Sequence, residues 1–297
     1  MQKKPMAEAN RISAMLNAVF AGEDRFPVDV RGLALEYSRQ CFPEEPIVSV
    51  EPLNIPGFEG LLACHSSKKK WKIGYNSSIK SPGRIRFTLA HELGHYLLHR
   101  EGQRSFSCTQ QDMHEWDEGD RKIESEADTF ASFLLMPAND FRCQISSNGP
   151  SIDLLLHCSD RYGVSPMAAA LKMVEIYPGR VVAVAAREGF VLWARSSKAA
   201  FKSGVYLASK KRLVEVPESS ILNISSSAET RKTASQRAQL WFPKEPHSMA
   251  LVEHIYVSEG NYPYTLGLLV LPDAVPKWQG DEEDELLHPI SGHLKKW

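Results

Sequence analysis

Two histidines and a glutamate stand close together in the pattern His91-Glu92-x-x-His95. Residues four apart share one face of an α-helix, so both imidazoles can bind a single metal ion while Glu92 points one step aside. This spacing is typical of metallopeptidases, in which the glutamate takes the proton of a water molecule that the metal activates. The pattern predicts a hydrolytic metal centre with Zn²⁺ (Zn2+) as its cofactor.

A third ligand has to come from elsewhere in the chain, because catalytic zinc usually takes three protein ligands and keeps its fourth position for water. The acidic stretch from Glu124 to Asp128 supplies carboxylates at helical spacing. We predict that Glu124 binds the metal and that Asp128, one turn later, accepts the spare ring N–H of a ligating histidine. Glu126 faces the wrong way if Glu124 faces inward.

Two helices must position these residues. Pro82 suits the first turn of a helix that carries the histidines. Apolar residues recur through this helix at helical spacing, at Ile85, Leu89, Leu93 and Leu97. A second helix is expected from about Asp117 to Met136, where Pro137 ends it. Gly94 costs on the order of 1 kcal/mol relative to alanine in a helix, so its presence predicts the close approach of another element.

Other polar residues near the motif stand outside the predicted ligand set. His99 lies two turns from His91, about 12 Å along the helix axis, which is too far for it to bind the same ion. The group that stabilises the oxyanion stays open among four candidates, which are His65, Tyr96, His114 and Tyr162.

The stretch from Ile73 to Leu171 resembles the ImmA/IrrE family of metallopeptidases. The resemblance is carried, in order and spacing, by Ile73-Gly74-Tyr75-Asn76, by Arg86-Phe87-Thr88-Leu89-Ala90 leading into the histidine motif, by Glu124-x-Glu126-Ala127-Asp128-x-Phe130-Ala131-x-x-Leu134-Leu135-Met136-Pro137, and by Arg161-Tyr162-Gly163-Val164-Ser165. It extends loosely toward the N-terminus and fades after residue 180.

That resemblance implies a zincin-like core, with His91, His95 and Glu124 as zinc ligands and Glu92 as the catalytic acid/base. It also implies a protein substrate, because characterised members relieve repression by cleaving, or promoting the loss of, a helix-turn-helix transcriptional repressor. The expected function is a zinc-dependent endopeptidase that derepresses stress, DNA-damage or mobile-element genes. The alternative is a non-enzymatic protein that sequesters the repressor and holds a structural metal.

Short strands are expected at residues 47–50, 60–65 and 70–75, where apolar and polar residues alternate. In zinc peptidases an edge strand beside the motif helix can pair with an extended substrate through backbone hydrogen bonds. We place Ile73 to Asn76 at that edge, with Tyr75 and Asn76 as substrate-binding residues.

Composition agrees with a soluble cytoplasmic enzyme. The chain has 297 residues, 43% of them hydrophobic, and a formal net charge of −1. This balance gives no electrostatic reason to expect nucleic acid or an anionic membrane as a partner. The N-terminus lacks the apolar core of a signal peptide, and no apolar run approaches the ~20 residues that span a bilayer. The five cysteines form no C-x-x-C pair and predict no disulfide framework.

The fold class is expected to be α+β, in four parts. These are a zincin-like metallopeptidase domain at 1–148, a helical helix-turn-helix-like segment at 149–179, a smaller α+β domain at 180–276 and an acidic tail at 277–297. The second helix of the helix-turn-helix-like segment carries Lys172 as its single basic residue. A recognition helix needs Arg, Lys, Asn or Gln at base edges, so packing or substrate docking is favoured over DNA binding.

The part after residue 180 is expected to hold strands at 181–186, 190–194, 249–257 and 264–271, with a polar helix within 225–240. By its position it is a candidate sensor or regulatory domain for a small-molecule or nucleotide effector. Phe190, Trp193 and Trp241 are candidates to line an effector pocket, with core packing as the alternative for each.

Overall fold

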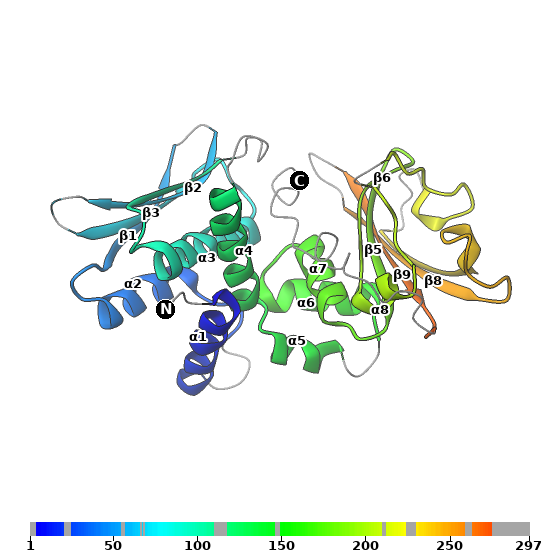
Figure 1. Ribbon diagram of the computed structural model, residues 1–297, viewed down its shortest axis with the longest axis horizontal. Helices are drawn as coiled ribbons and strands as arrows, with labels where there is room; N and C mark the ends of the chain where they lie inside the picture. The colour runs from blue at the N-terminus through cyan, green and yellow to red at the C-terminus, as the bar shows by residue number, and fades with distance from the viewer. Residues whose placement is uncertain are drawn as a thin grey trace. The chain divides into compact units, whose positions relative to one another are not determined.

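The computed structural model describes residues 4–20, 25–54, 57–65, 67, 69–109, 118–145, 149–209, 212–223, 230–258 and 263–274. This part of the chain is a mixed α+β structure, which confirms the predicted fold class, and it divides into two units (Figure 1). Unit 1 comprises residues up to Ala138 together with Asp160–Ser165, and unit 2 comprises Asn139–Ser159 and the described chain from Pro166 onward. The predicted tail at 277–297 lies outside the described residues.

Unit 1 contains a four-stranded sheet in the order β1-β3-β2-β4. Its strands are β1 (Ile47–Leu53), β2 (Phe58–His65), β3 (Lys70–Asn76) and β4 (Ser105–Thr109). Strand β3 runs parallel to β1 and antiparallel to β2, and β2 runs antiparallel to β4. The three predicted strands are confirmed, whereas β4 was not foreseen. Leu62, Trp71, Ile73 and Phe106 are buried at alternate positions, as a sheet covered on one face requires.

Four helices complete the core of unit 1. They are α1 (Pro5–Val19), α2 (Val30–Cys41), α3 (Pro82–His99) and α4 (Glu118–Leu135). The two that were predicted to position the site, α3 and α4, are confirmed. Helix α3 begins after Ser81, whose hydroxyl accepts from the Arg84 amide at 3.4 Å, and Pro82 occupies its first turn. Helix α3 packs against β2, β3 and α4, while α1 packs on α4 and α2 packs on α3 and β1 (Figure 1). The motif helix is therefore central to unit 1.

The chain then forms α5 (Ala138–Ile145), α6 (Ile152–Tyr162) and α7 (Pro166–Ile176). The turn between α6 and α7 belongs to unit 1, because the Arg86 guanidinium donates to the Gly163 carbonyl and Tyr162 packs edge-on against Phe26 at 5.1 Å. Gly163 has a φ of 58°, and a Cβ there would overlap the Arg86 side chain. The two units thus do not follow the boundaries predicted at 148 and 179, and the four predicted parts stay predictions.

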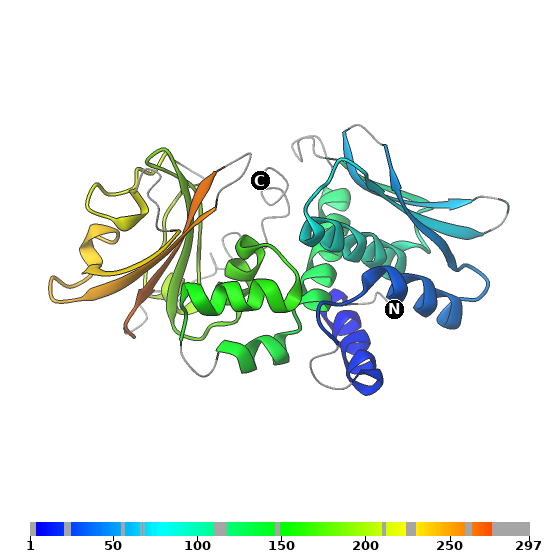
Figure 2. The same ribbon diagram turned by 180° about the vertical axis from the view of Figure 1, so that it is seen from behind.

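Unit 2 contains a five-stranded antiparallel sheet in the order β6-β5-β9-β8-β7, which Figure 2 shows from the opposite side. The strands are β5 (Arg180–Arg187), β6 (Phe190–Ser196), β7 (Arg231–Arg237), β8 (Ala250–Ser258) and β9 (Tyr264–Leu271). Short helices lie between them, namely α8 (Lys198–Lys202), η2 (Ile221–Asn223) and η3 (Ala238–Leu240). Helix α7 packs against β5 and β6.

The four predicted strands of this unit are confirmed, but the polar helix expected within 225–240 is wrong. Residues 231–237 form β7, which pairs along its length with β8, and residues 238–240 form the single turn η3. Pairing with β8 satisfies the backbone groups on one side of β7, so tertiary structure overrides the polar composition that suggested a helix. Residues 224–229 lie outside the described part.

The three aromatic residues proposed to line an effector pocket do not lie together. Trp241 belongs to an apolar cluster that includes Val184, and its Nε1 donates to the buried Glu253 carboxylate at 2.5 Å. Trp193 pairs with Ala185, the residue after Val184, and therefore faces the other side of the sheet. Phe190 is 37% exposed. The pocket assignment is wrong, and an effector of unit 2 stays a prediction.

No helix in the described ranges is both long and apolar enough to cross a membrane. The side chain of Lys172, the single basic residue of α7, is fully buried, and its Nζ lies 3.1 Å from Glu175 Oε2. Lys172 is therefore not available to contact a base edge, and the role of this segment stays a prediction. Burial lowers the pKa of Lys172 below its ordinary value of 10.5.

We expect Lys172→Met to raise the free energy of unfolding at pH 7 by about 1 kcal/mol, because it removes the cost of burying an ammonium group. The unfolded chain binds more protons than the folded chain between the lowered pKa and 10.5, so the wild type gains stability as pH rises through that window. The difference in the free energy of unfolding between Lys172→Met and wild type should therefore shrink as pH rises. Denaturant unfolding at neutral and alkaline pH measures this, with exposed Lys232→Met as the control. A variant less stable than wild type at pH 7 would contradict it.

Candidate metal centre

Helices α3 and α4 pack closely against each other at Gly94. A Cβ at this position would lie 3.1 Å from Phe130 Cδ1 and 3.2 Å from the Cα of Ala127, both on α4. The close approach predicted from this glycine is confirmed, and α4 is the element that makes it. The contact sets the acidic residues of α4 opposite the two histidines of α3.

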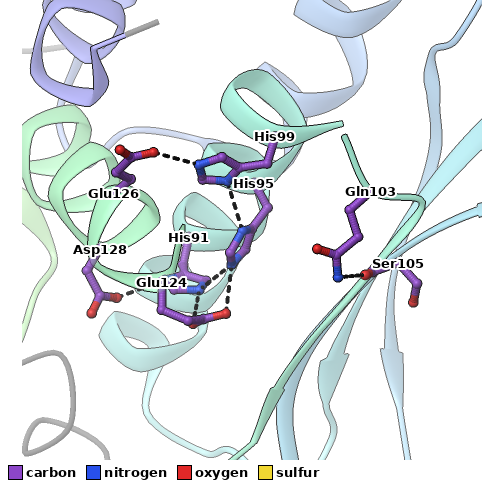
Figure 3. Close-up of polar contacts among 8 residues, drawn as sticks. All are labelled: His91, His95, His99, Gln103, Ser105, Glu124, Glu126 and Asp128. Atoms are coloured by element: carbon purple, nitrogen blue, oxygen red, sulfur yellow. Dashed lines mark hydrogen bonds and ion pairs between the residues drawn. The ribbon is translucent and has the colours of Figure 1, made fainter. Parts of the chain in front are cut away.

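Three side chains converge between these helices (Figure 3). The Nε2 atoms of His91 and His95 are 2.9 Å apart. Glu124 Oε2 lies 3.1 Å from His91 Nε2, and Glu124 Oε1 lies 3.2 Å from His95 Nε2. His91, His95 and Glu124 are all buried and form a group that can hold a metal ion. The structure therefore brings together the three ligands predicted from the sequence.

The geometry of this group suits a tetrahedral ion. Bonds of about 2.0–2.1 Å to a tetrahedral zinc place neighbouring ligand atoms about 3.3 Å apart. The separations of 2.9 to 3.2 Å among the two Nε2 atoms and the Glu124 oxygens are close to that value. The two nitrogens and the carboxylate are also a donor set that zinc prefers. The residues present thus fit the expected metal.

Asp128 lies where the sequence placed it. Its Oδ1 is 2.8 Å from His91 Nδ1, on the side of the ring opposite the cluster (Figure 3). An N–H donated to this carboxylate leaves Nε2 of His91 without a proton and aimed at the centre of the group. The contact is present in the structure, and the role of Asp128 in metal binding stays a prediction.

The ionisation states of the cluster suit a cation. Burial lowers the pKa of His95 to about 4, so this imidazole is neutral near pH 7. Burial alone raises the pKa of Glu124, but hydrogen bonds with His91 and His95 outweigh it and bring that pKa well below its ordinary value. A neutral imidazole and an ionised carboxylate are the forms that bind metals.

Glu92 is fully buried next to the cluster. Its carboxylate lies against Gly60 of β2, where a Cβ would overlap Glu92 Oε1 and would stand 2.7 Å from the Thr88 methyl. Gly60 therefore makes room for the proposed acid/base. Gly60 was not predicted to belong to the site, although a glycine inside a strand is a known sign of close approach by another group.

Strand β4 also contributes to the centre, through Phe106. The Phe106 ring stacks on the His95 ring, with centroids 4.6 Å apart and planes inclined by 19°. Stacking on one face of the imidazole restricts its rotation and keeps water from that side. Neither β4 nor Phe106 was predicted, because the region between the two helices carries no pattern that links it to the motif.

The placement of Ile73 to Asn76 at a sheet edge is wrong. These residues lie in β3, which is paired with β1 on one side and β2 on the other, so their backbone cannot also pair with a substrate. The Asn76 amide donates to the Phe58 carbonyl at 2.7 Å and accepts from the Ser78 amide at 2.9 Å. Tyr75 lies opposite Gly60. The outer strands of this sheet are β1 and β4.

The candidates for oxyanion stabilisation are not brought to the cluster as a set. The Tyr96 hydroxyl donates to the Glu45 carbonyl at 2.8 Å, and Tyr162 is buried against Phe26. His65 is exposed, with Nδ1 3.1 Å from the Ser67 hydroxyl. His114 lies outside the described residues. The group that stabilises the oxyanion therefore stays unassigned.

Comparison with protein families agrees with this geometry. Residues 44–173 match the family model of peptidase M78, the IrrE N-terminal-like domain. The matched range contains α3, α4 and the whole cluster, so the chain carries a zincin-like domain of this peptidase family. The family points to metallopeptidase activity, and the cluster is compatible with the metal ion that such activity needs. A comparison with curated proteins gives no match.

We expect Gly94→Ala to lower the free energy of unfolding by up to about 2 kcal/mol. Alanine gains about 1 kcal/mol of helix propensity, but overpacking against the α4 backbone costs about 1–3 kcal/mol. Denaturant unfolding of the metal-free protein measures the difference. The matched control is Gly102→Ala, because a Cβ there meets only the His99 carbonyl at 3.7 Å. If Gly94→Ala proved more stable than wild type, the close packing of α3 on α4 would be disproved.

Proposed function

We propose that this protein is a zinc-dependent endopeptidase that cleaves a helix-turn-helix transcriptional repressor and so derepresses stress, DNA-damage or mobile-element genes. The observation that carries the enzymatic part is the buried convergence of His91, His95 and Glu124 beside the carboxylate of Glu92. The family match supports the peptidase class. The repressor as substrate rests on the resemblance to the ImmA/IrrE family.

In this proposal His91, His95 and Glu124 hold the zinc ion. When bound, zinc polarises the peptide carbonyl and lowers the pKa of water. Glu92 accepts a proton as water attacks the carbonyl and passes it to the leaving amine. The position of Glu92 favours this role, because its carboxylate is confined between α3 and the backbone of Gly60. Asp128 holds His91 in the tautomer that presents Nε2.

An endopeptidase also has to hold an extended segment of its substrate across the site. We propose that β4 takes the role first assigned to β3. Strand β4 is an outer strand of the sheet, with β2 as its described partner, and its Phe106 contacts His95. Backbone pairing with an outer strand aligns a peptide without requiring a particular side-chain sequence. Specificity then depends on the side chains of the substrate.

The alternative function is sequestration of the repressor by a protein whose metal is structural. A structural zinc site is normally closed by four protein ligands and needs no carboxylate beside the first histidine. The group found among the described residues has three members, with Glu92 next to it. This arrangement favours the enzyme, and Glu92 is the residue that separates the two functions.

We expect Glu92→Gln to keep zinc and fold but to lower peptide hydrolysis by about 10²–10⁴-fold, because the amide cannot carry the proton. His95→Ala should lose zinc as well, since a ligand is removed. Zinc content, thermal unfolding and cleavage of the substrate measure these three properties on the same samples. Full activity of Glu92→Gln in cells would contradict the peptidase function.

The substrate can be identified from new protein N-termini in cells that express wild type or Glu92→Gln, before and after DNA damage. We expect a new N-terminus within a helix-turn-helix repressor that appears only with the wild-type protein. Such a terminus names both the substrate and the cleaved bond. No difference between the two proteins under any condition would support sequestration instead.

A further inference from the structure

Two polar residues stand behind His95, outside the proposed ligand set. They are His99, at the end of α3, and Glu126, on α4 (Figure 3). We propose that His99 and Glu126 form a hydrogen-bonded relay that positions His95 for zinc, as Asp128 does directly for His91. The inference rests on the proposed function only in taking zinc as the ion bound at the cluster.

The relay is continuous. His95 Nδ1 lies 3.2 Å from His99 Nδ1, and His99 Nε2 lies 3.0 Å from Glu126 Oε2. On the other side of the cluster, His91 Nδ1 lies 2.8 Å from Asp128 Oδ1. Each proposed zinc histidine therefore connects through Nδ1 to a carboxylate of α4. The connection is direct for His91 and passes through one further imidazole for His95.

The direction of the protons follows from the donor and acceptor capacity of imidazole. A neutral His95 that presents Nε2 to a metal carries its proton on Nδ1 and donates it to His99. His99 accepts at Nδ1, so its own proton is on Nε2 and is donated to Glu126. The opposite arrangement would place a proton on Nε2 of His95, facing the cluster. Because a carboxylate accepts and does not donate when ionised, Glu126 favours the first arrangement.

The surroundings of the relay strengthen it. The side chains of His99 and Glu126 are only 10% and 18% exposed. The Phe106 ring stacks on His95 and its centroid lies 6.1 Å from that of His99, so one flank of the relay is apolar. Hydrogen bonds shielded from water are stronger, and a carboxylate at the far end raises the basicity of His95 toward a cation. His99 and Glu126 are thus positioning residues, and neither is a ligand.

A purely structural role, in which His99 and Glu126 only join α3 to α4, makes a different prediction for two conservative variants. His99→Asn places an acceptor near the position of Nδ1 but is too short to reach Glu126. His99→Gln reaches Glu126 but has no acceptor at the Nδ1 position. If the relay acts on His95, His99→Asn retains more zinc affinity than His99→Gln. If the pair is only a link between helices, the order is reversed.

The test uses the full chain, with zinc affinity measured by chelator competition and the ligand field of bound Co²⁺ read from its visible spectrum. We expect His99→Leu to weaken zinc binding 10–100-fold and to shift the Co²⁺ bands, while the metal-free variant stays folded. Glu126→Met should weaken binding in the same way, and Glu126→Gln, which keeps an acceptor, should retain most of the affinity. The matched control is Glu101→Gln, at a carboxylate that is 85% exposed.

A double-mutant cycle completes the test. If both residues act through one relay, His99→Leu combined with Glu126→Met loses about as much affinity as His99→Leu alone. Additive losses, or wild-type zinc affinity in a folded His99→Leu protein, would overturn the relay. Should His99→Leu fail to fold, Glu126→Met and Glu126→Gln decide the question by themselves.

The outcomes also separate this inference from the proposed function. A wild-type protein that binds zinc and hydrolyses peptide, with His99 and Glu126 variants unchanged in affinity, refutes the relay alone. A wild-type protein that binds no zinc refutes both.

Discussion

The packing of α4 against α3 at Gly94 is the constraint on which the rest of unit 1 depends. A metal site needs side chains from both helices within a few ångströms, and helices with larger residues at the contact would hold their backbones further apart. Gly94 lets the backbone at Ala127 come within van der Waals contact, so Glu124 reaches both histidines of α3. Gly94 lies between His91 and His95 in the sequence. A glycine there stabilises the helix less than an alanine would, but it allows α4 to approach α3 closely.

Burial then determines the chemistry of the site. A buried imidazole resists protonation, and an ionised carboxylate next to it is stabilised by its hydrogen bonds. The cluster therefore has the charge distribution that a divalent cation requires at neutral pH. The carboxylates of α4 lie at different positions around the cluster: Glu124 contacts both histidines, Asp128 contacts Nδ1 of His91, and Glu126 contacts His99, which in turn contacts His95. Three carboxylates from one short acidic stretch of the sequence thus contact different histidine nitrogens.

The sheet also contributes to the site, through β2 and β4. Gly60 leaves space for the Glu92 carboxylate, and Phe106 covers one face of His95. Both residues come from the outer half of the sheet, where β2 pairs with β4. The strand that we propose to pair with an extended peptide is therefore also the strand that contacts a proposed zinc ligand. Unit 2 adds no member to this cluster among the described residues.

Local patterns in the sequence determined α3, α4 and most strands, because helical periodicity, a proline at the start of α3, and turn residues act over a few positions. They also determined His91, Glu92 and His95, which one helix places by itself. Only the tertiary structure decided what depends on distant pairing. Residues 231–237 form a strand because they pair with β8, and β3 lies inside the sheet because it pairs on both sides. Strand β4 brings Phe106 to His95, and Glu126 contacts His99. Glu124 and Asp128 combine both kinds of information. Their helical spacing predicted them from the sequence, but only the contact at Gly94 brings them to the histidines, because a sequence pattern does not contain the distance between two helices.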